Sequence, residues 1–223
     1  MARDAAQDGM TLGAVHRSVK ARIMAGEFPA GARLRPDALR GAYDVSASAM
    51  REVLLRLAVE GLVAQEEQRG FSVPTSDLAL LGELMDLRVL LEGEGAVQSM
   101  RRGDMEWEAG LAAAHHKLAH IEARMRDAED PAHLVPIWTR VDWEFHDALL
   151  SACPNRALRE EHRAVYERFR QQVVAATPTA GFRHETIEEH EAILNAAVAR
   201  DEDACRKAIR SHLWTYRDDM IGG

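Results

Sequence analysis

A helical period in the hydrophobic residues runs almost unbroken from Leu78 to the end of the chain, and this constrains the fold more than any other feature. No strand-like alternation interrupts it. The breaks contain Gly, Pro, Asn or Asp and fall near residues 103–104, 129–131, 154–155, 178–181 and 201–203. They predict six helices, so we expect an all-α antiparallel bundle over residues 78–221.

The first 75 residues follow a different pattern, with three shorter helical segments. Apolar spacing predicts these helices near residues 11–24, 36–43 and 46–61. Ser46 is a good N-cap for the third helix. The tight connection Asp44-Val45 before it is typical of a helix-turn-helix.

Two short β-capable runs follow these helices. Residues 62–65 and 71–73 flank a polar stretch that ends at Gly70, which predicts a hairpin wing. The stretch 74–77 breaks the pattern and provides a helix cap. We therefore expect a winged helix-turn-helix domain, of three helices and a small β-hairpin, over residues 10–75.

The distribution of charge also separates the two parts. The net charge of -8 argues against a nucleic-acid partner for the chain as a whole, because binding phosphates requires Lys and Arg. Residues 1–75, however, carry 10 basic against 9 acidic side chains, whereas residues 76–223 carry 18 against 27. All four Trp and nine of the ten His follow residue 100. The two parts are therefore expected to have separate tasks.

Several protein classes are disfavoured by the sequence. No apolar run approaches the roughly 20 residues of a membrane span, and the N-terminus is polar rather than a signal peptide. We therefore expect a cytoplasmic protein with no membrane partner. Cys153 and Cys205 form no CxxC pair, so we interpret both as small core residues rather than a disulfide framework.

A set of spaced motifs runs through the first domain. They are IMAGEFPAGARL at residues 23–34, Val45-Ser46, Arg51-Glu52, Arg56-Leu57, EGLV at residues 60–63, and Arg69-Gly70. Together they resemble the GntR family of bacterial transcriptional regulators. The resemblance spans about residues 10–75 and implies that the domain binds double-stranded operator DNA.

A recognition helix presents its N-terminal residues to base edges, while Arg side chains and backbone amides fix its register on phosphates. Ser46, Ser48 and Arg51 are the candidates for the helix, and Arg69 with Gly70 for the wing. A surface ion pair with Asp44 is the alternative for Arg51.

The start of the recognition helix departs from its family. Residues 46–52 read Ser-Ala-Ser-Ala-Met-Arg-Glu where the family pattern is Ser-Arg-Thr-Pro-Val-Arg-Glu, so an Arg that usually contacts DNA is Ala47 here. One good contact between Arg and guanine contributes about 1 to 3 kcal/mol of discrimination. We expect Arg35, with Arg33 and Arg40, to compensate, although each could be an ordinary solvated charge.

The second half contains an independent set of candidate ligands. Asp142 and His146 stand four residues apart and share one helical face, as two ligands of one metal require. A surface or hydrogen-bonded pair has the same spacing. His190 and His212 lie on the last two predicted helices, and an antiparallel hairpin would bring both to one level.

The four candidate ligands occur together with Leu87, Arg88 and Glu92 on the first helix of this half. With these residues, the segment of about residues 78–220 resembles the FCD effector domain of FadR-type GntR regulators. The resemblance implies that the Asp and the three His hold a divalent metal in the core of the bundle. Such a ligand set suits zinc, with nickel, manganese or iron(II) also open. A polar core satisfied by water is the alternative.

Other polar residues are less specific. Arg88 could anchor the carboxylate of an effector through two hydrogen bonds, and an i,i+4 ion pair with Glu92 is equally open. His116 and His120 have ligand-like spacing but match no motif position, so we interpret them as a solvated face. His184 is ambiguous, because it lies only six residues before a predicted ligand.

The resemblance implies a regulator that binds operator DNA and responds to a small organic acid. We expect a homodimer, because two winged helices would match the two half-sites of a palindromic operator. A metalloenzyme is the second hypothesis, since three His and one Asp with open positions could activate water. No HExxH motif, no Glu three residues before a His and no nucleophile elbow supports it. A regulator whose metal is purely structural, or is itself the signal, is the third. The effector, the operator and the direction of regulation stay open.

Overall fold

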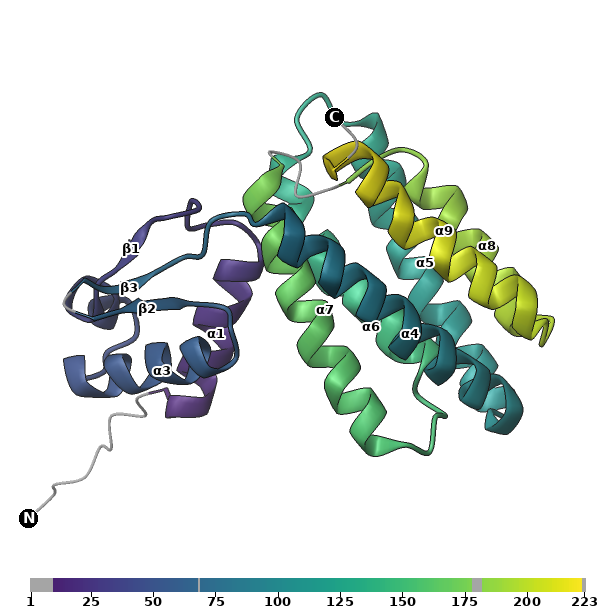
Figure 1. Ribbon diagram of the computed structural model, residues 1–223, viewed down its shortest axis with the longest axis horizontal. Helices are drawn as coiled ribbons and strands as arrows, with labels where there is room; N and C mark the ends of the chain where they lie inside the picture. The colour runs from purple at the N-terminus through teal and green to yellow at the C-terminus, as the bar shows by residue number, and fades with distance from the viewer. Residues whose placement is uncertain (1–9, 68, 178–181, 222–223) are drawn as a thin grey trace, which may run out of the picture. The chain divides into compact units, whose positions relative to one another are not determined.

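A computed structural model of the chain describes residues 10–67, 69–177 and 182–221 (Figure 1). The chain divides into two compact units between Thr75 and Ser76. The predicted helix break at residues 178–181 lies outside the described residues. Within them, none of the helices combines the length and apolarity needed to span a membrane.

The N-terminal unit begins with helix α1, Leu12–Met24, which is capped by the side chain of Thr11. The short helix α2, Pro36–Leu39, has Pro at its first turn and continues as the 3₁₀ helix η1, Arg40–Ala42. Asp44 takes a left-handed backbone conformation, with φ of 51°, in the turn that follows. The second and third helical segments are thus joined by a tight connection, as the sequence predicts.

Helix α3, Ala47–Val59, is the third helix expected from the sequence. The Ser46 hydroxyl accepts a hydrogen bond from the backbone N–H of Ala49 at 3.1 Å, which confirms the predicted N-cap. After its end, Gly61 adopts a φ of 78° that only Gly takes without strain. The apolar face of α3 packs on that of α1, and the buried residues of the two helices are Val15, Val19, Ile23, Met24, Met50, Val53, Leu54 and Leu57.

A small antiparallel sheet completes the unit. Its strands are β1, Arg33–Leu34, β2, Ala64–Glu66, and β3, Gly70–Ser72, in the order β1-β3-β2. The hairpin of β2 and β3 is the predicted wing, displaced by one or two residues. Strand β1 was not predicted, because two residues are too few to show a period. Leu34 pairs with Phe71, and both are buried.

The C-terminal unit is all helical. Within the described residues it has the six predicted α-helices and one short 3₁₀ helix. They are α4, Leu78–Arg102, α5, Met105–Asp127, η2, Ala132–Leu134, α6, Val135–Leu149, α7, Arg156–Ala176, α8, Thr186–Val198, and α9, Glu202–Ile221. Asp77, Asp104 and Asn155 cap α4, α5 and α7 with their side chains. Local polar signals therefore set where these helices begin.

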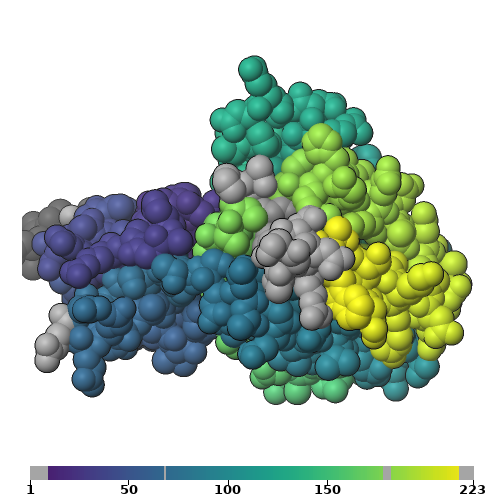
Figure 2. Space-filling model, turned by 45° about the horizontal axis from the view of Figure 1, so that its top comes forward, coloured from purple at the N-terminus to yellow at the C-terminus, as the bar shows by residue number. Residues whose placement is uncertain are grey.

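The helices pack around one apolar core. Helix α4 lies against α7 and α9, α5 lies against α6 and α8, and α8 lies beside α9 (Figure 1). Figure 2 shows α9 between α4 and α8 at the surface of this unit. Trp138, Phe145 and Leu149 of α6 are fully buried in this core. Cys153 and Cys205 are both free and buried, as expected from the sequence.

Gly95 on α4 lies close to Leu150 and Leu158, and its replacement tests this packing. A Cβ atom there would lie 2.7 Å from the side chain of Leu150 and 3.0 Å from that of Leu158. We expect Gly95→Ala to lower the free energy of unfolding by about 1 to 3 kcal/mol, because the overpacking outweighs the gain in helix propensity.

Gly110→Ala on α5 is the matched control, because its Cβ would meet nothing within 4 Å. This variant should be unchanged or stabilised by up to about 1 kcal/mol. Urea unfolding of the full chain measures both effects, and equal stability of the two variants would contradict the packing of α4.

Candidate metal centre and DNA-binding surface

Three imidazoles meet in the core of the helical unit. His146 comes from α6, His190 from α8 and His212 from α9, and each is 1% exposed or less. One ligand atom from each ring lies within 4.8 Å of those of the other two. The structure thus brings together three histidines that are up to 66 residues apart in sequence.

Asp142 lies beside two of these rings. It stands one turn before His146 on α6, and its Oδ1 atom is 3.8 Å from His146 Nε2 and 3.5 Å from His190 Nε2. Its other oxygen, Oδ2, accepts a hydrogen bond of 2.5 Å from the hydroxyl of Tyr166 on α7. All four predicted ligands are therefore neighbours in space.

Each imidazole is backed by a carboxylate. The Nδ1 atom of His146 lies 2.6 Å from Glu92 Oε1, and that of His190 lies 2.9 Å from Glu122 Oε1. The Nδ1 atom of His212 lies 2.9 Å from Oε2 of Glu189, the residue that precedes His190 on α8. Such carboxylates fix the ring orientation and make Nε2 a stronger electron donor.

Two of the Nε2 atoms are left without a hydrogen-bond partner. Those of His146 and His190 are buried, and nothing in the described part of the chain bonds to them. A buried unsatisfied nitrogen costs about 1 to 3 kcal/mol, and here both point toward the same carboxylate oxygen of Asp142. A cation between them would satisfy both nitrogens and the oxygen.

Glu92 and Asp142 are held in their charged form. Burial alone would raise the pKa of Glu92, but His146 and Arg88 outweigh it and hold that pKa well below its ordinary value. Burial would also raise the pKa of Asp142, but the charges of His146 and His190 outweigh it, and the pKa of Asp142 is lowered. Burial raises the pKa of Tyr166, which therefore stays protonated and donates to Asp142.

The imidazoles differ in their tendency to take up a proton. Burial lowers the pKa of His146 to about 4, and burial together with the charge of His190 lowers that of His212. At His190 burial opposes charging, but Glu122 and Asp142 outweigh it and raise the pKa. Metal binding requires neutral imidazoles, and a cation would occupy the place of that proton at His190.

The donor set fits a divalent metal. Three imidazole nitrogens and one carboxylate oxygen are ligands of zinc and of the other first-row metals. The carboxylates behind the rings are the outer contacts that such sites use. Burying so many polar groups is costly for folding, which makes the cluster a candidate for function rather than for stability.

Sequence reasoning missed several residues of this cluster. Glu92 was named in the family resemblance and as a partner of Arg88, but not as a contact of a metal ligand, and Glu122 and Tyr166 were not identified. His162 was also missed, and its Nε2 atom lies 3.0 Å from Glu92 Oε2. Glu122 stands in the apolar stripe of α5, four residues after the buried Leu118, and a carboxylate at a core position was the signal available.

Of the two roles considered for Arg88, the structure shows the ion pair with Glu92. Its Nε donates to Glu92 Oε2 at 2.9 Å, and both side chains are buried, so the ion pair is formed. Its guanidinium carbon lies 4.8 Å from the ring centroid of Tyr166 and 5.0 Å from that of Phe169. The Nη2 atom has no hydrogen-bond partner in the described residues, which leaves a donor for an anionic ligand.

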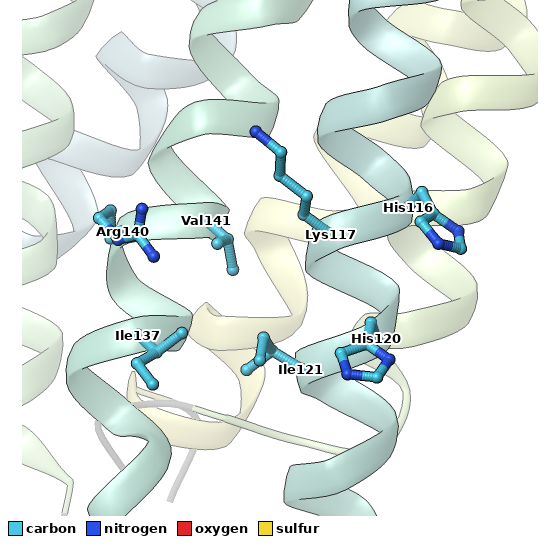
Figure 3. Close-up of a pocket in the computed structure, with 7 residues that line it drawn as sticks. All are labelled: His116, Lys117, His120, Ile121, Ile137, Arg140 and Val141. Carbon is cyan, nitrogen blue, oxygen red and sulfur yellow. The ribbon is translucent and has the colours of Figure 1, made fainter.

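The remaining histidines lie elsewhere. His116 and His120 are exposed on α5, as expected, and border a groove of about 500 Å³ between α5 and α6 (Figure 3). Ile121, Ile137 and Val141 point into this groove, and none of its residues belongs to the histidine cluster. His184 is exposed near the start of α8.

The predicted DNA-contacting residues lie at the surface of the N-terminal unit. All six are exposed, namely Arg35, Ser46, Ser48, Arg51, Arg69 and Gly70. The Arg51 guanidinium lies 5.6 Å from the ring centroid of Phe71 on β3, and Arg69 pairs with Glu66 at 3.1 Å. Within residues 10–67 and 69–177, no ion pair joins Arg51 to Asp44, the alternative considered for Arg51.

Comparison with known families agrees with both units. The model of the bacterial regulatory proteins of the gntR family matches residues 12–73, and the FCD domain model matches residues 83–214. The chain belongs to the GntR family and carries an FCD domain. It is therefore a transcriptional regulator and not an enzyme, which excludes the metalloenzyme considered from the sequence.

Individual relatives support this assignment over most of the chain. The HTH-type transcriptional regulator BphR of Paraburkholderia xenovorans (strain LB400) is 34% identical over 203 residues, which cover 90% of this chain and 81% of BphR. The HTH-type transcriptional repressor GlaR of Escherichia coli (strain K12) is 27% identical, covering 90% of this chain and 91% of GlaR. The structure of E. coli McbR/YncC shares the fold, with a TM-score of 0.79 at 20% identity over 96% of this chain and 98% of McbR.

Replacing a carboxylate behind the cluster tests whether it serves a metal. We expect Glu122→Gln to weaken zinc affinity by about 10- to 100-fold, because a neutral amide oxygen is a weaker acceptor than the carboxylate and makes His190 a weaker electron donor. Zinc titration in competition with a chelator measures the affinity, and circular dichroism checks the fold. Glu129→Gln, at an exposed position on the loop after α5, is the control. Equal zinc affinity of the two variants would contradict the role of Glu122.

Proposed function

We propose that this regulator binds operator DNA as a homodimer and that a small organic acid changes its DNA affinity by binding at a divalent metal in the helical unit. One observation carries the proposal: three buried imidazoles converge, and each is backed by a carboxylate. The helical unit is an FCD domain, and relatives of the whole chain are transcriptional regulators. Both findings support a sensing role for this unit.

The metal would be held by Asp142, His146, His190 and His212. Zinc is the first candidate, and nickel, manganese and iron(II) accept the same donors. An ion with more than four coordination positions would keep places open for a carboxylate of the effector. The free Nη2 of Arg88 would then hold the other oxygen of that carboxylate.

The N-terminal unit would supply the contacts with DNA. Ser46, Ser48 and Arg51 lie at the start of α3, which in this fold enters the major groove. Arg69 and Gly70 would reach the backbone or the minor groove from the wing. Two such units in a twofold dimer match the half-sites of a palindromic operator, and we place the protein with the chromosome in the cytoplasm.

Regulation requires that the effector distinguish two arrangements of the dimer. A ligand changes DNA affinity only to the extent that it binds one arrangement more tightly than the other. The candidate site joins side chains from α4 to α9, so a ligand there can alter the packing of several helices at once. A metal that is purely structural, or that is itself the signal, would use the same four ligands.

Arg51 tests the DNA-binding part of this function. We expect Arg51→Ala to weaken binding by about 1 to 3 kcal/mol, since it removes a contact at the base-reading end of α3. Electrophoretic mobility shifts measure the effect on a duplex selected by the wild-type protein from random sequences. Arg56→Ala removes an exposed Arg further along the same helix and should have a smaller effect. If Arg56→Ala weakens binding as much as Arg51→Ala, then α3 does not read DNA as proposed.

Release of the same duplex tests the sensing part. Lactate, gluconate, benzoate and succinate are added to the zinc-loaded protein, and we expect at least one of them to change duplex affinity. The change should vanish in His190→Ala and persist in His116→Ala, which removes an exposed histidine of α5. An acid that acts equally on the His190 variant would contradict the metal-dependent sensor. Release by zinc alone would identify the metal as the signal.

A further inference from the structure

A second buried arginine lies next to the candidate metal site and lacks a carboxylate partner. Arg170 of α7 is 2% exposed. Its Nη2 atom donates to Thr139 Oγ1 at 2.9 Å, and its guanidinium carbon lies 4.2 Å from the ring centroid of Trp138. Its Nε atom has no hydrogen-bond partner, and no carboxylate of the described residues pairs with it within 4.0 Å.

This arrangement is unusual for a buried charge. A buried ion without a counter-ion costs several kcal/mol, and a hydroxyl and the face of one Trp offset only part of that cost. Arg88, on the neighbouring helix α4, differs in having a full ion pair with Glu92. The charge of Arg170 is thus available to an anion that enters the bundle.

Arg170 stands one helical turn away from the candidate metal ligands. It follows Tyr166 by four residues on α7, and its partner Thr139 precedes Asp142 by three residues on α6. The hydrogen-bonded pairs Tyr166–Asp142 and Arg170–Thr139 therefore join the antiparallel helices α6 and α7 at two levels, one helical turn apart. One turn of helix corresponds to a rise of about 5.4 Å.

The start of α8 lies at the same level. The rings of Trp138 and Phe182 are 5.5 Å apart, which places the segment before α8 against Trp138. Thr186 precedes His190 by one turn on α8, is fully buried, and has no hydrogen-bond partner for its hydroxyl in the described residues. The hydroxyl of Thr186 is thus a second donor, and it lies on the same side of the histidines as Arg170.

We propose that the effector carries two acidic groups, one bound at the metal with Arg88 and the other bound by Arg170. This inference rests on the proposed function, which requires only one carboxylate, and it narrows the effector to dicarboxylates. Arg170 is then a specificity-determining residue, and Thr186 donates a hydrogen bond to the second group. A monocarboxylate leaves Arg170 unpaired and binds more weakly.

Matched pairs of acids test the inference on the full chain loaded with zinc. Succinate and butyrate differ only in the second carboxylate, and so do adipate and hexanoate. Isothermal titration is expected to show at least tenfold tighter binding of the dicarboxylate in one of the pairs. Equal affinity within both pairs overturns the inference but leaves a carboxylate sensor intact, whereas no binding by any of the four acids overturns both. This comparison needs no variant.

Arg170→Gln should remove the preference for the dicarboxylate while leaving the affinity for the monocarboxylate and for zinc unchanged. Arg168→Gln, two residues away and half-exposed, should keep the preference. Thr186→Val, nearly isosteric, gives a second variant and should reduce the preference by a smaller factor. Loss of affinity for mono- and dicarboxylates alike in Arg170→Gln would show that Arg170 only maintains the fold, and would overturn the inference.

Discussion

The structure of the helical unit depends on the pairing of carboxylates with buried imidazoles. Glu92, Glu122 and Glu189 each hold the Nδ1 atom of a different histidine. The first two pairs join residues more than 50 positions apart in sequence, and the third joins the neighbouring helices α8 and α9. Charged groups in a core are tolerated only when their partners are in place, because each unpaired ion costs several kcal/mol. The network ties helices from different parts of the sequence together, and it brings one ligand atom of each of the three rings within 4.8 Å of the others.

This constraint connects sensing to structure. Helices α6, α8 and α9 supply the histidines, while α4, α5 and α7 supply the groups that orient them or hold Asp142. A cation or an acid bound at their centre stabilises the packed form by mass action. In a dimer, a change in that packing can alter the spacing of two recognition helices. Under this proposal the helical unit would control DNA binding through ligand binding alone, and it would not need to catalyse a reaction.

Local patterns predicted most of the fold. Periodicity located the helices, Ser46 was identified as a cap, and the family motifs placed the winged helix-turn-helix. Strand β1 was missed because its pairing with Phe71 joins residues 37 apart, and no local signal marks it. At the site, the i,i+4 spacing of Asp142 and His146 could be read directly. Glu122 could not be assigned to His190, because that contact depends on how α5 and α8 pack.

The presence of a metal centre in the helical unit is best tested by an anomalous difference map from crystals of the full chain, recorded at the absorption edge of the metal that copurifies with it. We expect a peak bounded by the Nε2 atoms of His146 and His190, the Oδ1 atom of Asp142, and the ring of His212. A map with no peak there, or with a peak only beside the exposed His116 and His120, would contradict a metal centre in the helical unit.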